Sequence, residues 1–203
     1  MTTFPGSSHN RLNNIQVGAA RFQGVLIKPD EVFSFGAQMG PVGPEQGYLP
    51  GLVILNDHEE NQYGGGMCQV SSTLFRAALL AGLPIVERHP HSFAVGFYTA
   101  PFGVPGVDAA IFYPGTDLKV KNDTGHYILI QTILSGTTLK FDLYGTKTKE
   151  GQLRGPTFLE GTNDATKPSK TVFYRDVLVN GQVTKTNTFT SYYRSSLDFP
   201  ISD

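Results

Sequence analysis

Apolar residues recur at helical spacing in two segments of the chain. In the first, residues 11–24, Ile15, Ala19 and Phe22 follow i, i+4, i+7 spacing. The second is residues 68–81, and its apolar stripe consists of Val70, Leu74, Ala77, Ala78 and Ala81. Both segments are therefore predicted to form helices, with the second as the central helix of the fold.

Short apolar or alternating runs predict strands along most of the remaining chain. These runs are residues 25–27, 32–35, 52–55, 85–86, 91–98, 109–113, 118–121, 127–133 and 139–143. The continuous run 52–55 is typical of a buried strand, and the Gly- and Pro-rich residues 36–50 are expected to form a loop. The pattern predicts an α+β fold in which one central helix packs on an antiparallel β-sheet.

The C-terminal part of the chain has a different pattern. Residues 146–169 are polar with several Gly and Pro, which indicates a connector. Two alternating runs, 171–178 and 182–190, then flank Asn180-Gly181, the signal for a type I′ hairpin turn. We expect a main domain over 1–145, followed over 146–203 by a linker and a C-terminal β-hairpin extension. Because an isolated hairpin is marginally stable, it should dock on the main sheet or a neighbouring domain.

Composition and charge narrow the function classes. The 203 residues carry a net charge of −1, and only 16% are charged, so the chain lacks the basic stripe of a nucleic-acid-binding protein. The sequence contains no run of about 18 apolar residues, so it predicts no transmembrane segment. The single cysteine rules out an intramolecular disulfide, which directs attention to the chemistry of its thiol.

That cysteine, Cys68, follows three glycines and opens the second predicted helix. Free N–H groups and the positive end of the helix dipole favour thiolate over thiol at such a position. Glycines such as Gly65 and Gly66 would let a substrate approach the backbone closely. The alternative is a buried structural cysteine, since free Cys is among the most buried residue types.

A histidine and an aspartate follow Cys68 in an order that suits nucleophilic catalysis. His91 heads one predicted strand and Asp108 lies near the head of the next, so adjacent strands would set them side by side. His91 could then exchange a proton with Cys68 while Asp108 fixes the ring tautomer. His89 competes with His91 for this role, but a histidine next to a proline is most often a solvated turn residue. Asp108 could simply cap a turn.

Other roles remain open for residues around this trio. Gln69 could orient a substrate amide or stabilise an oxyanion, or be an exposed first-turn residue. Arg11 could bind a carboxylate or form a surface ion pair. Cys68, His89, His91 and Asp108 could together supply metal ligands, but no second cysteine or further histidine cluster supports such a site.

Motifs between residues 10 and 145 resemble the VanW family. They are Asn10-Arg11, Asn14-Ile15, Pro29 to Phe35, Gly40-Pro41, Gly47-Tyr48, Gly64 to Leu74, Glu87 to Ser92, Asp108 to Ala110, Asp117-Leu118 and Lys121-Asn122. The resemblance implies a cell-envelope setting, because the family takes its name from a vancomycin-resistance cluster of Gram-positive bacteria. The expected location is extracellular or at the cell surface, with a membrane or wall tether in the full-length protein.

Two further resemblances concern fold and chemistry. Gly66-Met67-Cys68, the helix end 77–84, His91 and Asp108 follow the order found in transglutaminase-like cysteine folds. This implies Cys68 as nucleophile, His91 as base and Asp108 as the residue that orients the ring, in a transglutaminase/papain-like arrangement. The tail 171–193 resembles a G5-type β module.

Three functional hypotheses follow. The first is a thiol-dependent amidase, peptidase or transpeptidase acting on peptidoglycan peptides through Cys68, His91 and Asp108, with no cofactor. The second is a non-catalytic module that binds the cell wall or acts as a scaffold. The third is a Cys/His/Asp metal site.

Overall fold

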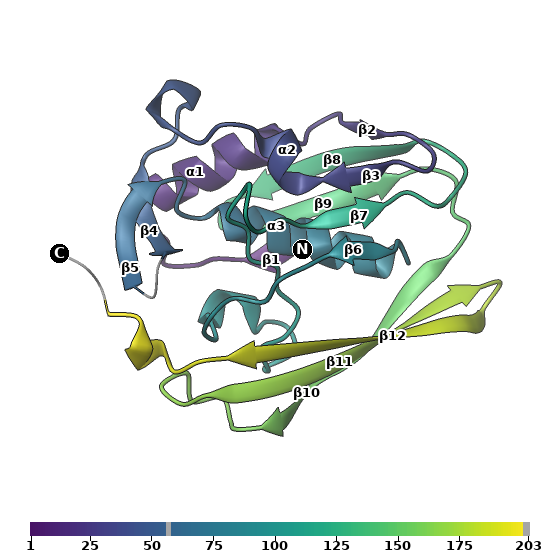
Figure 1. Cartoon of the computed structure of the whole chain (residues 1–203). Coiled ribbons are helices and arrows are strands. Elements are labelled where there is room, and N and C mark those ends of the chain that lie inside the picture. The colour runs from purple at the N-terminus through teal and green to yellow at the C-terminus, as the bar shows by residue number, and fades with distance from the viewer. Residues whose placement is uncertain (56–57, 201–203) are drawn as a thin grey trace.

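A computed structural model describes residues 1–55 and 58–200, and Figure 1 shows the arrangement of the elements. The α-helices are α1 (His9–Ala20), α2 (Phe35–Met39) and α3 (Met67–Leu80). Three 3-10 turns are η1 (Pro44–Gln46), η2 (Gly96–Tyr98) and η3 (Ser196–Asp198). The strands form antiparallel sheets around α3, so the predicted α+β class is confirmed.

Four sheets contain all the named strands of the described chain. The first has the order β1-β9-β8-β2, from Thr2–Thr3, Thr138–Tyr144, Ile128–Ser135 and Leu26–Ile27. The second has the order β3-β7-β6, from Val32–Ser34, Lys119–Lys121 and Ile85–Glu87. The third pairs β4 (Pro50–Leu55) with β5 (His58–Tyr63). The fourth has the order β10-β11-β12, from Glu150–Glu160, Ser169–Val179 and Gln182–Tyr193.

Helix α3 is the centre of the core, as its apolar stripe predicts. It packs against α1, β1 and β9 on one side and against β10 on another, so it is enclosed rather than lying on one sheet. Val70, Phe75, Ala78 and Leu79 are fully buried. Polar residues of the same helix are buried as well, which means that their hydrogen bonds must be made within the protein.

The N-terminal half departs from the predicted pattern in three places. Helix α1 begins at His9, because Ser8 caps it by accepting a hydrogen bond from the Arg11 N–H. The predicted loop 36–50 contains α2 and η1. The run 52–55 forms a strand, as predicted, within a two-stranded ribbon, but Leu52 is 52% exposed, so the predicted burial is wrong at this residue. The side chains of residues 54 and 55 lie outside the described part of the structure.

The segments that contain His91 and Asp108 are not the continuous strands that the sequence predicts. Residues 91–98 end in η2, and residues 109–113 take part only in isolated bridges, His89 with Ala110 and Phe112 with Thr116. The apolar alternation is present, but side chains of α3, and not a neighbouring strand, bond backbone groups of Ala109 and Tyr98 in these segments.

The C-terminal extension is a three-stranded sheet rather than a hairpin. The predicted connector contains the eleven-residue strand β10. The predicted type I′ turn is confirmed, since Asn180 and Gly181 have φ of 50° and 77° between paired Val179 and Gln182.

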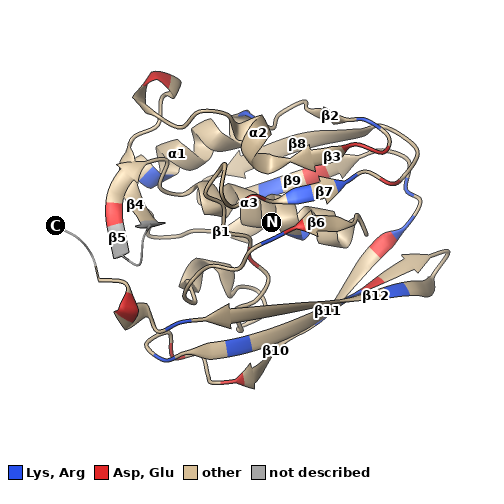
Figure 2. Cartoon of the chain, viewed as in Figure 1, with Lys and Arg blue, Asp and Glu red and all other residues tan. Residues whose placement is uncertain are grey.

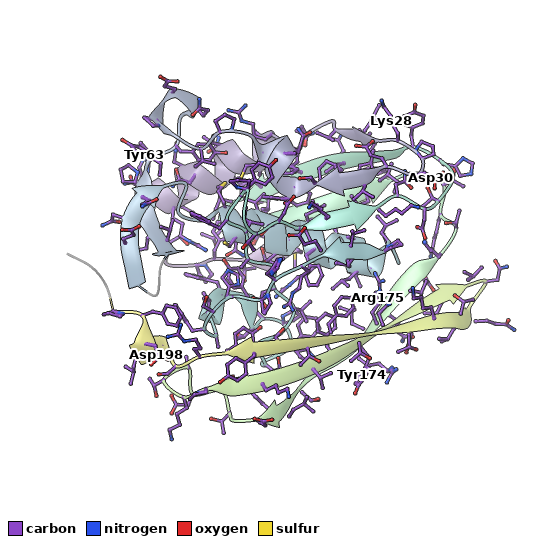
Figure 3. The ribbon with its side chains drawn as sticks, in the orientation of Figure 1. Lys28, Asp30, Tyr63, Tyr174, Arg175 and Asp198 are labelled. Atoms are coloured by element: carbon purple, nitrogen blue, oxygen red, sulfur yellow. The ribbon has the colours of Figure 1, made fainter. Side chains whose placement is uncertain are left out.

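This sheet shares the core of the main body. Phe173 and Phe189 stack at 4.7 Å, and Phe75 of α3 contacts both rings edge-on. Arg175 points from β11 toward the body and donates to the Leu83 carbonyl at 2.5 Å, while Tyr174 points away (Figure 3). The extension is therefore docked tightly on the end of α3.

Charges are dispersed over the surface. Figure 2 shows acidic and basic residues interspersed over the sheets and loops, without a segregated basic face. Within residues 1–55 and 58–200, no helix has the length and apolar composition needed to cross a membrane.

The close contact of β10 with α3 can be tested at Gly151. A Cβ at this position would lie 1.8 Å from the Leu79 carbonyl oxygen, so Gly151→Ala must separate strand and helix. We expect a loss of about 1–3 kcal/mol in the free energy of unfolding, measured by urea denaturation. Gly96→Ala is the control, because a Cβ there meets nothing within 4 Å. Equal midpoints for the two variants would contradict this packing.

Candidate active site

Cys68 occupies the second position of α3, where the glycine run ends. Gly64 and Gly66 have φ of 88° and 115°, a conformation that favours glycine. A Cβ on Gly65 would lie 2.6 Å from the Gly51 carbonyl carbon, and one on Gly66 would press on α1. The glycines thus allow the start of α3 to pack closely against β4 and α1. This packing role differs from the expectation that Gly65 and Gly66 let a substrate approach the backbone.

His91 and Asp108 are brought together by a short antiparallel contact. The bridge between His89 and Ala110, extended by two residues in the same register, sets His91 opposite Asp108. Nδ1 of His91 lies 2.5 Å from Oδ2 of Asp108, and the His91 backbone N–H donates to the same oxygen at 2.9 Å. The ring of Tyr98 stacks on the imidazole at 4.6 Å, which fixes the plane of the ring.

The thiol of Cys68 lies beside this imidazole. Cys68 is half-buried, and its thiol interacts with His91 and lies 3.8 Å from the carbonyl oxygen of Ile111. Burial alone would raise the pKa of the thiol, but the hydrogen bond and charge of His91 outweigh it and lower that pKa. Burial likewise opposes protonation of His91, yet Asp108 and Cys68 raise its pKa to about 9. Both shifts favour a thiolate–imidazolium pair over a neutral thiol beside a neutral imidazole.

Asp108 is a buried carboxylate that accepts hydrogen bonds on both oxygens. Oδ2 faces His91, while Oδ1 accepts from Arg88 Nη2 at 2.9 Å and from the Tyr193 hydroxyl at 2.7 Å. Burial would raise the pKa of this carboxyl, but the Arg88 guanidinium and His91 hold it well below its usual range. Asp108 is consequently an anion that fixes the orientation of His91.

The backbone N–H of Cys68 is available at the start of the helix. The neighbouring N–H groups of Met67 and Gln69 donate to Gly64 and Gly66 at 3.1 and 3.0 Å. Within the described residues, no acceptor engages the Cys68 N–H. A donor of this kind, next to the thiol and at the positive end of α3, can stabilise negative charge on a substrate oxygen.

The other predicted site residues have different surroundings. Gln69 is fully buried, accepts from Arg11 Nη2 at 2.9 Å and donates to Thr2 at 2.6 Å, so both ends of its amide are engaged within the protein. The Arg11 guanidinium also lies over the Phe97 ring at 4.2 Å. His89 is exposed and contacts Glu87 at 3.2 Å, so His91 alone of the two histidines joins the thiol.

The metal alternative is not supported by this geometry. His89 turns away from the trio, and His91 Nδ1 is occupied by Asp108. In the part of the chain that the structure describes, no group of three or more His, Cys, Asp and Glu residues is arranged to hold a metal ion.

Sequence reasoning missed three residues that support the trio: Arg88, Tyr98 and Tyr193. Arg88 adjoins the His-Pro-His run, and its charge so close to a candidate base was an available signal. Tyr193 contacts Asp108 across 85 residues of sequence, and no local pattern indicates that contact.

The fold and the site define an α+β protein in which a cysteine at a helix N-terminus lies beside a buried histidine–aspartate pair. Residues 10–144 match the family described as VanW like protein, and the chain belongs to this family. It is 34% identical over 154 residues to the uncharacterized protein YoaR of Bacillus subtilis, a match covering 76% of this chain and 49% of YoaR.

A second relative is the vancomycin B-type resistance protein VanW of Enterococcus faecalis. The identity is 38% over 117 residues, covering 57% of this chain and 42% of that protein. The matches thus span less than half the length of either relative. No solved structure matches the chain, so the transglutaminase-like resemblance is not confirmed.

The buried ion pair of Arg88 and Asp108 gives a test of stability. Arg88→Met leaves the carboxylate without its cationic partner, and we expect the free energy of unfolding to fall by about 3–5 kcal/mol. Lys147→Met is the control, because that lysine pairs with Glu150 where both side chains are exposed, and it should contribute little. Similar urea midpoints for the two variants would contradict a structural role for Arg88.

The charge state of His91 gives a second test. Its ring should stay protonated at pH 7 and titrate near pH 9, followed by NMR of the imidazole carbons. Cys68→Ala removes an adjacent anion, which destabilises the imidazolium and lowers the pKa of His91. The pKa should remain above the ordinary value of about 6.5, because Asp108 still faces the ring. Superimposable titrations in the two proteins would contradict the thiolate–imidazolium pair.

Proposed function

We propose that the protein is a cysteine-type amide hydrolase or acyl transferase of the cell envelope, acting on peptidoglycan peptides. The observation that carries the proposal is the thiol of the half-buried Cys68 beside His91, whose Nδ1 lies 2.5 Å from the buried Asp108 carboxylate. This is the set of groups that acyl transfer through a thioester requires, in the order seen in transglutaminase-like folds.

The proposed reaction has two steps. The Cys68 thiolate adds to the amide carbonyl, and the Cys68 backbone N–H stabilises the resulting oxyanion. His91 gives its proton to the leaving amine as the C–N bond breaks, which leaves a thioester on Cys68. Neutral His91 then takes a proton from water, for hydrolysis, or from an acceptor amine, for transfer, while the oxygen or nitrogen of that molecule adds to the thioester carbonyl. The C–S bond breaks, the carboxylic acid or the new amide leaves, and Cys68 returns to the thiolate.

The substrate class rests on family membership. One relative is named a vancomycin B-type resistance protein, and the cell-envelope setting and the peptidoglycan substrate are carried to this chain from that name. An extracellular or surface location, with a tether elsewhere in the full-length protein, belongs to the same proposal. The alternative function is a non-catalytic module that binds the wall through the same family fold.

The decisive experiment is the rate of Cys68 alkylation by iodoacetamide against pH. Cys68 is the only cysteine, so the reaction reports on this thiol alone. Pairing with His91 should give a plateau that begins below about pH 7. His91→Ala removes the imidazolium, so the rate should rise only near the free-thiol pKa of about 8.5.

The two functions predict different results in this experiment. A wild-type profile that already follows an ordinary thiol, and does not change in His91→Ala, would overturn the catalytic proposal. The wall-binding alternative would then be tested with purified peptidoglycan, where Cys68→Ala should bind as the wild type does. An early plateau that His91→Ala abolishes supports the catalytic proposal and justifies screening peptidoglycan peptides as substrates.

A further inference from the structure

The C-terminal sheet contributes two side chains to the cluster around Asp108. Tyr193 of β12 donates its hydroxyl to Oδ1 of Asp108 at 2.7 Å, and Ser191 accepts from Arg88 Nη1 at 2.9 Å. Both residues are 1% exposed, whereas Tyr192 between them is 58% exposed. This alternation, with period two along β12, turns one face of the strand toward the candidate site.

The contacts on Asp108 lock the carboxylate in one orientation. Oδ2 accepts from the His91 ring and backbone, while Oδ1 accepts from Arg88 and Tyr193. Rotation of the carboxylate away from His91 would break the bonds on Oδ1 as well. Burial and the charge of Asp108 raise the pKa of Tyr193, so its hydroxyl remains a donor throughout the neutral range.

We infer that Tyr193 is a positioning residue for the thiol–imidazole pair and that β12 completes the active site. This inference rests on the proposed function. Arg88 connects the same parts, since it bonds Asp108, the Gly106 carbonyl and Ser191. The residues that match the family end at 144, whereas β12 begins at Gln182. The reactivity of Cys68 therefore depends on a sheet that lies outside the matched region.

The test compares Tyr193→Phe with Tyr192→Phe in the whole chain, with two measurements on each. The first is the alkylation rate of Cys68 against pH. The second is the NMR signal of the His91 Nδ1 proton, which a short hydrogen bond to Asp108 should shift far downfield and protect from exchange.

Without the phenol, Asp108 can turn from His91, and the imidazolium and thiolate both lose stabilisation. We expect alkylation at pH 7 to fall about tenfold, the effect of losing one hydrogen bond to a charged group, together with loss of the downfield signal.

The outcomes separate this inference from the proposed function. A wild-type profile with an early plateau that Tyr193→Phe retains, with the proton signal unchanged, overturns the inference and leaves the function standing. A wild-type profile without the plateau overturns the function. Tyr192→Phe should match the wild type, and an equal loss in that control would also overturn the inference.

Folding of the variant is checked by its urea transition. If Tyr193→Phe does not fold, Ser191→Ala decides the question, because it removes a partner of Arg88 while keeping the phenol. A smaller fall in alkylation rate in Ser191→Ala supports the inference, and wild-type behaviour overturns it.

Discussion

The buried carboxylate of Asp108 is the group on which the candidate site depends. An ionised carboxylate taken out of water without partners is costly by several kcal/mol, so its position must be compensated within the fold. Arg88, directly after β6, supplies a positive charge. Tyr193 of β12 and His91, which precedes η2, supply further hydrogen-bond donors. Segments that are distant in sequence therefore contact the same carboxylate. These contacts on Asp108 fix the orientation of His91, and His91 in turn lowers the pKa of Cys68.

The irregular segment that holds Asp108 is supported by polar side chains of α3. Ser71 donates to the Ala109 carbonyl at 2.6 Å, and Ser72 accepts from the Ala109 N–H at 3.0 Å. Arg76 donates to the carbonyls of Tyr98, Ala100 and Val107. These bonds satisfy backbone groups that a neighbouring strand would otherwise satisfy. The helix that presents the thiol thus also holds the carboxylate, which fixes the distance between the two ends of the trio.

The sequence supports prediction where the signal is local. Helix α3 and the Asn180-Gly181 turn were predictable, since apolar period and turn chemistry act over a few residues. The order of Cys68, His91 and Asp108 was visible for a similar reason. Strand β10 was missed because two glycines and a proline interrupt its sequence, and its three apolar residues, Leu153, Phe158 and Leu159, do not alternate with polar ones. Residues 91–98 and 109–113 alternate like strands, but Ser71, Ser72 and Arg76 replace the ladder that the pattern suggests. Tyr193 lay beyond prediction because only the tertiary packing of β12 brings it to Asp108.

Charge balance explains how so many ionised groups can share one buried site. With Cys68 as the thiolate that the proposed function requires, Cys68 and Asp108 are balanced by protonated His91 and by Arg88, two anions against two cations. Under the proposed chemistry, formation of the thioester removes the negative charge from Cys68 while His91 loses its proton to the leaving amine. Arg88 and Asp108 then remain as a neutral pair. The cluster therefore carries no net charge either before or after acylation, and the desolvation cost of a lone buried charge is avoided in both states. Arg88 is required for this balance, since without it the resting site would hold an uncompensated anion.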